Sequence, residues 1–228
     1  MNVLGIICAR KGSKRLRHKH WLGIGGTPMF AVALDAAGNS DLKNVVLSSD
    51  DRKMWRYIND TYPEIWWSWR NPKLAQDRTP IHLVLQDVVD AMGGVAEQFN
   101  AVAFIPANVP TVTAALIDKT INALAANKRA TAAMTVRAVR DYPEWMWRAG
   151  KYLRREFPLQ TKYRVQDLPA RFIATGSVNV VRLDVLMKCK SSAAYAWLGP
   201  RIVPVLDEGA IEVHDRADYE RAKEALES

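Results

Sequence analysis

Short apolar runs alternate with amphipathic segments from the amino terminus to about residue 140. The first run, residues 3–8, reads VLGIIC, and such runs are typical of strands buried on both faces of a parallel sheet. The segments between the runs repeat their apolar residues at helical spacing. This alternation predicts an α/β fold with a doubly wound, mostly parallel sheet flanked by helices. Strands are expected at 3–8, 45–49, 65–69, 101–105, 131–136, 177–182 and 202–205.

Local sequence signals mark where several of the helices begin and end. Thr27 and Thr79 each precede a proline, which predicts a side-chain cap followed by proline at the first helical position. We expect these two helices to end at Gly38 and Gly93, because glycine commonly follows the last helical residue. Near the carboxyl terminus, Asp215 is the expected N-cap of an amphipathic helix.

The alternation of strands and helices breaks between residues 141 and 174. This stretch is rich in aromatic and basic residues, which favours an inserted hairpin or a small dimerisation lobe. A strand resumes at residue 177, and no linker, internal repeat or low-complexity tract divides the chain. We therefore expect residues 1–228 to form a single domain that carries 141–174 as an inserted lobe.

Composition places the chain among ordinary globular proteins. Its 228 residues are 49% hydrophobic and 25% charged, and no apolar run approaches the roughly 18 residues of a membrane span. The amino-terminal run lacks the basic residues that open a secretory signal, and the two cysteines have no metal-ligand spacing. These features favour a cytoplasmic protein with two free thiols and no membrane partner.

The net charge is +8, and the position of the basic residues along the chain is more informative than the total. Residues 10–19 read RKGSKRLRHK, a block without an acid that directly follows the first predicted strand. Such a block suits a nucleic acid, a membrane surface or a small polyanion. Ligands of open α/β sheets bind beyond the carboxyl ends of the strands, where Gly12 and Ser13 would allow close backbone approach. The loop has neither dinucleotide-fingerprint nor P-loop spacing, and we interpret it as a cradle for a triphosphate.

The residues of this loop, ARKGSKRL at 9–16, resemble the opening motif of the acylneuraminate cytidylyltransferases, the CMP-sialic acid synthetases and their relatives that activate acidic sugars. Further segments resemble this family in the same order along nearly the whole chain. They are VVLSSDD at 45–51, RNPKLAQDRTP at 70–80, YPEW at 142–145, RVQDLP at 164–169 and TGSVN at 175–179. Each segment alone is a weak signal, whereas six in order form a specific one.

The resemblance implies a Rossmann-like domain with a lobe that exchanges contacts in a homodimer. It also implies transfer of CMP from CTP to the anomeric hydroxyl of an eight- or nine-carbon acidic sugar, with release of pyrophosphate. By resemblance, the catalytic cations that neutralise the departing phosphates are Arg10, Lys14 and Lys19. The implied nucleotide contacts are Ala9, Arg10, Gly12, Ser13, Lys14, Arg15, His20, Arg70, Asp77 and Asn108. The implied contacts to the sugar, including its carboxylate, are Arg164, Gln166 and Thr175.

Three departures from the family pattern bear on the expected chemistry. His20 stands where the family usually has an asparagine, and Asn108 is the candidate polar contact where a glutamine or aspartate is usual. Glu212 and His214 replace the two aspartates of a D-I-D motif that binds Mg²⁺ from alternate strand positions. We expect these two residues to hold Mg²⁺, and the histidine makes the site more tolerant of Mn²⁺ or Zn²⁺.

Two further interpretations stay open from the sequence. The chain is a family member with altered base, metal or sugar use, or with weakened catalysis, if the departures change its chemistry. Alternatively, its charge and its eight tryptophans serve an α/β protein that binds nucleic acid. The position of the charge favours a triphosphate, because Asp50, Asp51 and Asp77 are expected near the same edge and would repel a duplex.

Overall fold

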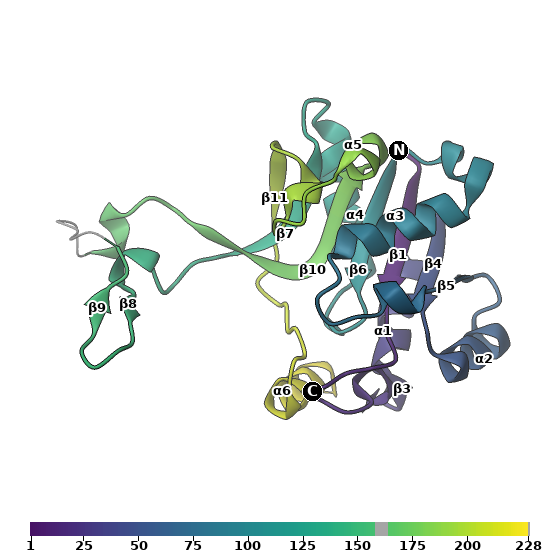
Figure 1. Ribbon diagram of the computed structural model, residues 1–228, viewed down its shortest axis with the longest axis horizontal. Coiled ribbons are helices and arrows are strands. Elements are labelled where there is room, and N and C mark those ends of the chain that lie inside the picture. Colours follow the sequence, from purple (N-terminus) through teal and green to yellow (C-terminus); the bar gives the residue numbers. More distant parts are fainter. Residues whose placement is uncertain (158–163, 228) are drawn as a thin grey trace.

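The computed structural model describes residues 1–157 and 164–227, and its central element is a seven-stranded sheet (Figure 1). The strands are β1 (Val3–Cys8), β4 (Asn44–Ser49), β5 (Trp66–Trp69), β6 (Ala101–Pro106), β7 (Ala132–Ala138), β10 (Phe172–Arg182) and β11 (Ile202–Leu206). They lie in the order β11-β7-β10-β6-β1-β4-β5 across the sheet. All neighbouring pairs are parallel except those of β10, which runs antiparallel to β6 and β7.

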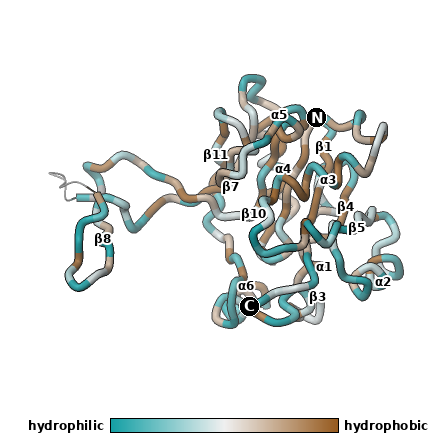
Figure 2. Tube along the Cα trace, in the orientation of Figure 1, coloured by the Kyte–Doolittle hydropathy of each residue, from teal (hydrophilic) through white to brown (hydrophobic). Residues whose placement is uncertain are grey.

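Helices cover both faces of this sheet, which confirms the doubly wound α/β fold predicted from the sequence. One face packs against α1 (Met29–Gly38), α2 (Arg52–Thr61) and α4 (Ala114–Ala126). The other face packs against α3 (Ile81–Ala91) and α5 (Leu183–Lys188). Each face has its own cluster of buried apolar side chains, and Figure 2 shows the central strands as mostly hydrophobic. Burial on both faces explains why these strands read as continuous apolar runs.

The starts of two helices differ from the sequence prediction. The N-cap positions of α1 and α3 are occupied by the prolines themselves, Pro28 and Pro80, without a side-chain hydrogen bond. The predicted caps at Thr27 and Thr79 are therefore wrong. The physical reason at the first position is strand pairing, because Thr27 belongs to β3 (Thr27–Pro28), which pairs with β2 (Gly23–Ile24). A residue before proline also favours extended backbone, which keeps each threonine out of the helix.

The carboxyl-terminal segment closes the edge of the sheet where β1 and β6 end. The N–H of Val213 donates to the carbonyl of Asn108, just after β6, at 2.8 Å. The helix that follows, α6 (Arg216–Glu227), packs on the β2–β3 hairpin, and the hydroxyl of Tyr219 donates to the carbonyl of Gly23. Residues from the end of the chain are thereby brought against the basic loop that follows β1.

The stretch predicted as a lobe extends away from the sheet (Figure 1). It carries a small hairpin of β8 (Trp147–Arg148) and β9 (Arg154–Arg155). Strand β10 begins within this stretch, earlier than the predicted start at 177, and runs from it into the sheet. The exposed apolar side chains here are Met146, Trp147, Tyr152, Leu153, Phe157, Phe172 and Ile173. The division into one domain with an inserted lobe stays a prediction.

Composition also predicts two free thiols and no membrane partner. Cys8 and Cys189 are both free, and burial raises the pKa of the Cys8 thiol. No helix among the described residues has the length and hydropathy needed to cross a membrane.

Candidate active site

Three adjoining pockets lie along the edge of the sheet where β1, β6 and β7 end. The central pocket has a volume of about 490 Å³. It shares Arg10, Lys19, Asp77 and Asn108 with an inner pocket of about 220 Å³. The wall formed by Glu212 and His214 belongs both to the central pocket and to an outer pocket of about 490 Å³. The central pocket therefore lies between the other two.

The central pocket gathers much of the basic loop after β1. Two of the loop's cations, Arg10 and Lys14, form ion pairs with Asp77, which comes from the segment after β5. Hydrogen bonds from Lys14 and Arg10 hold the pKa of the Asp77 carboxyl below its usual range. The lining residues are Arg10, Ser13, Lys14, Arg15, Lys19, Asp77, Asn108, Glu212 and His214. Such a concentration of cations around one cavity suits a compact polyanion.

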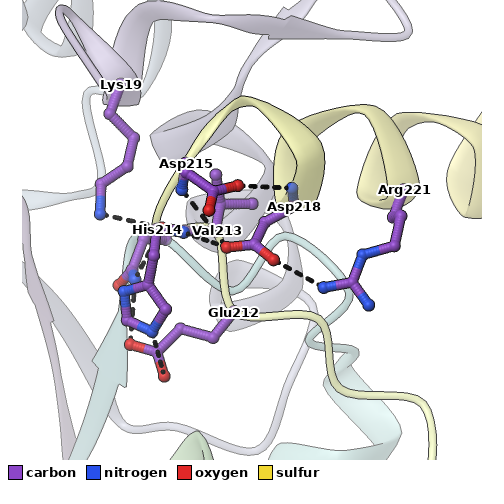
Figure 3. Close-up of polar contacts among 8 residues, drawn as sticks. Lys19, Glu212, Val213, His214, Asp215, Asp218 and Arg221 are labelled. Carbon is purple, nitrogen blue, oxygen red and sulfur yellow. Dashed lines mark hydrogen bonds and ion pairs between the residues drawn. The ribbon is translucent and has the colours of Figure 1, made fainter. Parts of the chain in front are cut away.

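Lys19 reaches the central pocket from the short 3-10 turn Lys19–Trp21. Its ammonium donates to the carbonyl of Val213 at 3.0 Å, a contact drawn in Figure 3. Burial lowers the pKa of Lys19, while the nearby Glu212 carboxylate acts in the opposite direction. The side chain is thus a positioned cation that also fastens the carboxyl-terminal segment to the basic loop.

Two buried polar residues, His20 and Arg70, line the inner pocket. His20 is 9% exposed, and its Nδ1 atom has no hydrogen-bond partner within the described residues. Burial, together with the charge of Lys19, lowers the pKa of His20 to about 3, so the imidazole is neutral. The guanidinium of Arg70 donates to the carbonyl of Ser48 at 2.9 Å and to its hydroxyl at 3.3 Å. Arg70 is therefore held against β4 while it lines the pocket.

A row of hydrogen-bonded side chains forms the wall between the central and outer pockets. The Nδ2 atom of Asn108 donates to Oε1 of Glu212 at 3.1 Å. Oε2 of Glu212 lies 3.2 Å from Nε2 of His214, as Figure 3 shows for these two side chains. Gly176 of β10 lies directly beside this wall. A Cβ atom added to it would be 3.4 Å from Oε2 of Glu212, and its φ of +76° lies in the left-handed region that favours glycine.

The start of α6 fixes the position of this wall. The side chain of Asp215 accepts the N–H of Asp218 at 3.0 Å, and the side chain of Asp218 accepts the N–H groups of His214 and Asp215. This reciprocal capping confirms Asp215 as the helix cap. It also occupies both carboxylates, as Figure 3 shows. The predicted strand setting of Glu212 and His214 is wrong, because the segment between β11 and α6 is irregular and its backbone is held by these caps.

Glu212 and His214 are the predicted metal ligands, and their side chains are 39% and 46% exposed. Within residues 1–157 and 164–227, no group of three or more His, Cys, Asp or Glu side chains is placed to hold a metal ion. Two protein donors fit a divalent cation that takes its remaining ligands from phosphates and water, as Mg²⁺ commonly does. The residues present therefore fit a metal bound together with a nucleotide.

The outer pocket contains Thr175, one of the predicted sugar contacts. The Thr175 hydroxyl donates to Oδ2 of Asp207 at 2.9 Å and lies 2.9 Å from the hydroxyl of Thr135. Ser177 donates to the same Asp207 oxygen at 2.6 Å. The pocket is lined by Arg137, Arg140, Ala174, Thr175, Glu208, Ala210, Ile211, Glu212, His214, Asp218 and Arg221. The arginines at 137 and 140 are absent from the sequence prediction, although their place just after the strand expected at 131–136 is a signal for them.

The remaining predicted residues lie outside the linings of these three pockets. Arg164 forms an ion pair with Asp167 in the lobe, at 2.9 Å, and Gln166 is exposed beside it. Ala9 is buried, and its N–H donates to the carbonyl of Ser48 at 3.1 Å. Gly12 has open space around its Cβ position, so the loop can approach a ligand there.

Comparisons with known proteins show the family to which the chain belongs. The model of the family described as cytidylyltransferase matches residues 4–146, more than half of the chain. None of the curated proteins compared with the chain matches it. The chain is similar to the solved structure of CMP:2-keto-3-deoxy-manno-octonic acid synthetase complexed with CTP, with a TM-score of 0.73 and 15% identity over 100% of this chain and 99% of that one. It is also similar to 4-diphosphocytidyl-2C-methyl-D-erythritol synthase from Anaerococcus prevotii, with a TM-score of 0.70 and 14% identity over 100% and 96% of the two chains.

Similarity to solved structures at this level of identity shows the fold, an α/β fold of nucleotide transferases. The family match is more specific. The chain belongs to the cytidylyltransferase family, and it is an enzyme that transfers CMP from CTP. The resemblance carried by the six sequence motifs is confirmed at this level.

Proposed function

We propose that the acceptor of the CMP group is the anomeric hydroxyl of an eight- or nine-carbon acidic sugar. The observation that carries this proposal is the adjacency of the three pockets, because the central pocket shares lining residues with each of the other two. With the nucleoside of CTP in the inner pocket and its phosphates in the central one, the α-phosphate lies toward Glu212 and His214. The sugar then occupies the outer pocket, on the other side of that wall.

In this reaction the acceptor oxygen attacks the α-phosphorus, and the bond from that phosphorus to the β-phosphate oxygen breaks. The hydroxyl proton passes to water. Pyrophosphate leaves with the electron pair of the broken bond, so negative charge develops on its bridging oxygen. Arg10, Lys14, Arg15 and Lys19 surround the central pocket and neutralise this charge, which is the main task of a protein in phosphoryl and nucleotidyl transfer. Before CTP binds, Asp77 holds two of these cations in place.

Mg²⁺ is part of the proposal, with Mn²⁺ as an alternative. Glu212 and His214 would hold the ion at the wall between nucleotide and acceptor. When bound, the ion would supply further positive charge to the phosphates. The imidazole is a softer ligand than a second carboxylate, which supports use of Mn²⁺ by this chain.

A homodimer, a sugar contact from the lobe and a cytoplasmic location complete the proposal. The lobe exposes large apolar side chains, among them Trp147, Tyr152 and Phe172, which supports its burial against a second copy. Arg164 and Gln166 lie in this lobe, so they would serve an acceptor pocket across the dimer. The nucleic-acid alternative is less favoured, because the acids Asp77 and Glu212 lie among the cations of the central pocket.

The test is pyrophosphate release from CTP with a panel of acceptors, in the presence of Mg²⁺ or Mn²⁺. The panel contains sialic acid, 2-keto-3-deoxy-manno-octonic acid and a neutral sugar of similar size. We expect turnover with at least one acidic sugar, none with the neutral sugar, and a loss of turnover in the double variant R10Q/K14Q. Turnover confined to non-acidic acceptors, or salt-sensitive DNA binding without any turnover, would contradict the proposed acceptor.

A further inference from the structure

The outer pocket is lined by arginines that the predicted sugar contacts do not include. Thr175 is the only one of the three predicted contacts among its described lining residues, and it is a neutral group. Arg137, Arg140 and Arg221 bring three guanidinium groups to the same cavity, which has a volume of about 490 Å³. Arg137 is at the end of β7, and Arg140 follows just beyond the strand.

Each of the acids that line the pocket has a partner other than Arg137 and Arg140. Arg221 is neutralised by Asp218, at 2.6 Å. Glu212 is occupied by Asn108 and His214, in the wall described above. The side chain of Glu208 accepts the N–H of Ala138 at 3.5 Å.

Arg137 and Arg140 are left without an acidic partner. Neither side chain forms an ion pair or a hydrogen bond with a carboxylate in residues 1–157 and 164–227, and both residues are exposed. Two exposed guanidinium groups at one end of a polar cavity are suited to an oxyanion, because each can donate two parallel hydrogen bonds to it.

A buried network positions the strand end from which these arginines project. Thr135 is two residues before Arg137 on β7, so the two side chains point to the same face of the sheet. The Thr135 hydroxyl lies 2.9 Å from that of Thr175 and accepts the N–H of Val178 at 3.1 Å. Arg137 therefore lies on the same face of the sheet as Thr135, and it lines the outer pocket together with Thr175.

We propose that Arg137 and Arg140 determine the specificity for the acceptor by binding its oxyanion, a carboxylate or a phosphate. The inference rests on the proposed function, because it takes the outer pocket to be the acceptor pocket. The wall of Glu212 and His214 then separates this anion from the nucleotide phosphates. Binding of this oxyanion holds the acceptor in the outer pocket. The hydroxyl of the acceptor then faces the α-phosphate of CTP across the wall.

The experiment is calorimetric titration of acceptors into the protein saturated with Mg²⁺ and the non-reacting analogue α,β-methylene-CTP. The probes are 2-keto-3-deoxy-manno-octonic acid for the carboxylate, erythritol 4-phosphate for the phosphate, and erythritol as the neutral reference. The variants are R137Q and R140Q. The matched control is R56Q, which removes an exposed arginine from α2, away from the pockets.

We expect one anionic probe to bind and erythritol not to bind. Each of R137Q and R140Q should raise the dissociation constant of that probe by about tenfold or more, as the loss of a charged hydrogen bond predicts. The affinity for the CTP analogue and the melting temperature should stay unchanged, and R56Q should behave as the wild type. The probe that binds more tightly shows whether the pocket takes a carboxylate or a phosphate, and either preference supports the inference.

Equal binding of anionic and neutral probes, or wild-type affinity of both arginine variants, would overturn the inference. If either result is found while the CTP analogue binds normally, transfer of CMP from CTP is not contradicted. Failure of the wild-type protein to bind the CTP analogue would count against the proposed arrangement of the nucleotide site itself. The two failures are therefore distinguishable.

Discussion

Lys19 offers a direct test of the triphosphate cradle. Its ammonium lies in the central pocket and donates to the carbonyl of Val213 at 3.0 Å. The substitution K19M keeps a side chain of similar length and removes the charge. It should weaken CTP binding, because one of the cations that faces the phosphates is lost.

The expected size of the effect follows from the chemistry of the contact. A hydrogen bond that involves a charged group contributes about 1.5–3 kcal/mol, which corresponds to an increase of roughly 10- to 150-fold in the dissociation constant for CTP. The carbonyl of Val213 also loses a donor in a half-buried position, which costs about 1 kcal/mol of stability. For a chain of this length, that loss lowers the melting temperature by roughly 2–4 °C.

The matched control is K11M, in the same loop. Lys11 is exposed and belongs to the lining of a separate pocket beside Trp21 and Asp51, so its removal changes the net charge equally without touching the central pocket. Calorimetric titration with CTP and Mg²⁺ should show the loss of affinity for K19M and near wild-type affinity for K11M. Equal losses in both variants would mean that overall charge attracts the nucleotide, and the positioned cradle would be refuted.

Three further predictions concern residues that hold the pocket walls in place. T175V should lower the free energy of unfolding by about 1–3 kcal/mol in urea titrations, because the buried carboxylate of Asp207 loses a hydroxyl donor. G176A should lower it by about 1–2 kcal/mol, since the φ of +76° is costly for any residue with a Cβ atom. D77N should flatten the acid dependence of the melting temperature. The folded-state pKa of Asp77 is depressed, so its two ion pairs stabilise the fold above about pH 4 and are lost as the pH falls toward that lower value.

Each of these predictions has a result that would contradict it. T175S keeps the hydroxyl and should behave as the wild type; a loss equal to that of T175V would assign the effect to packing. A G176A protein as stable as the wild type would mean that the backbone of β10 around residue 176 relaxes without strain. If D77N and the wild type lose stability in parallel as the pH falls below about 4, the Asp77 ion pairs contribute nothing to the fold.

Much of the fold could be predicted because its strands are buried on both faces. A strand such as residues 3–8 must then be apolar throughout, and the basic loop after it is conspicuous by contrast. The sequence order of strands also predicts where parallel strands end, so the loop at 10–19 and Asn108 could be placed at one edge. This part of the site depends on local sequence and on a general rule of α/β sheets.

The rest depends on long-range contacts that periodicity does not reveal. β10 enters the sheet antiparallel between β6 and β7, and only this insertion brings Thr175 into the pocket that Arg137 lines. The segment around Glu212 resembles a strand in its alternation, but the capping of α6 by Asp215 sets its backbone instead. The prediction of threonine caps is wrong because proline itself occupies the cap position. Only the family resemblance points to Arg164, and within the described residues it pairs with an acid of the lobe.

The central claim is that the pockets at the ends of β1 and β6 bind CTP for transfer of CMP. The most direct test is the melting temperature of the protein with each of the four nucleoside triphosphates and Mg²⁺ or Mn²⁺. At 100 times its dissociation constant, CTP should stabilise the fold by about 2.7 kcal/mol, which corresponds to an increase of roughly 5–11 °C. The account predicts this increase for CTP and a clearly smaller one for ATP, GTP and UTP. Equal increases with all four, or none with CTP, would contradict it.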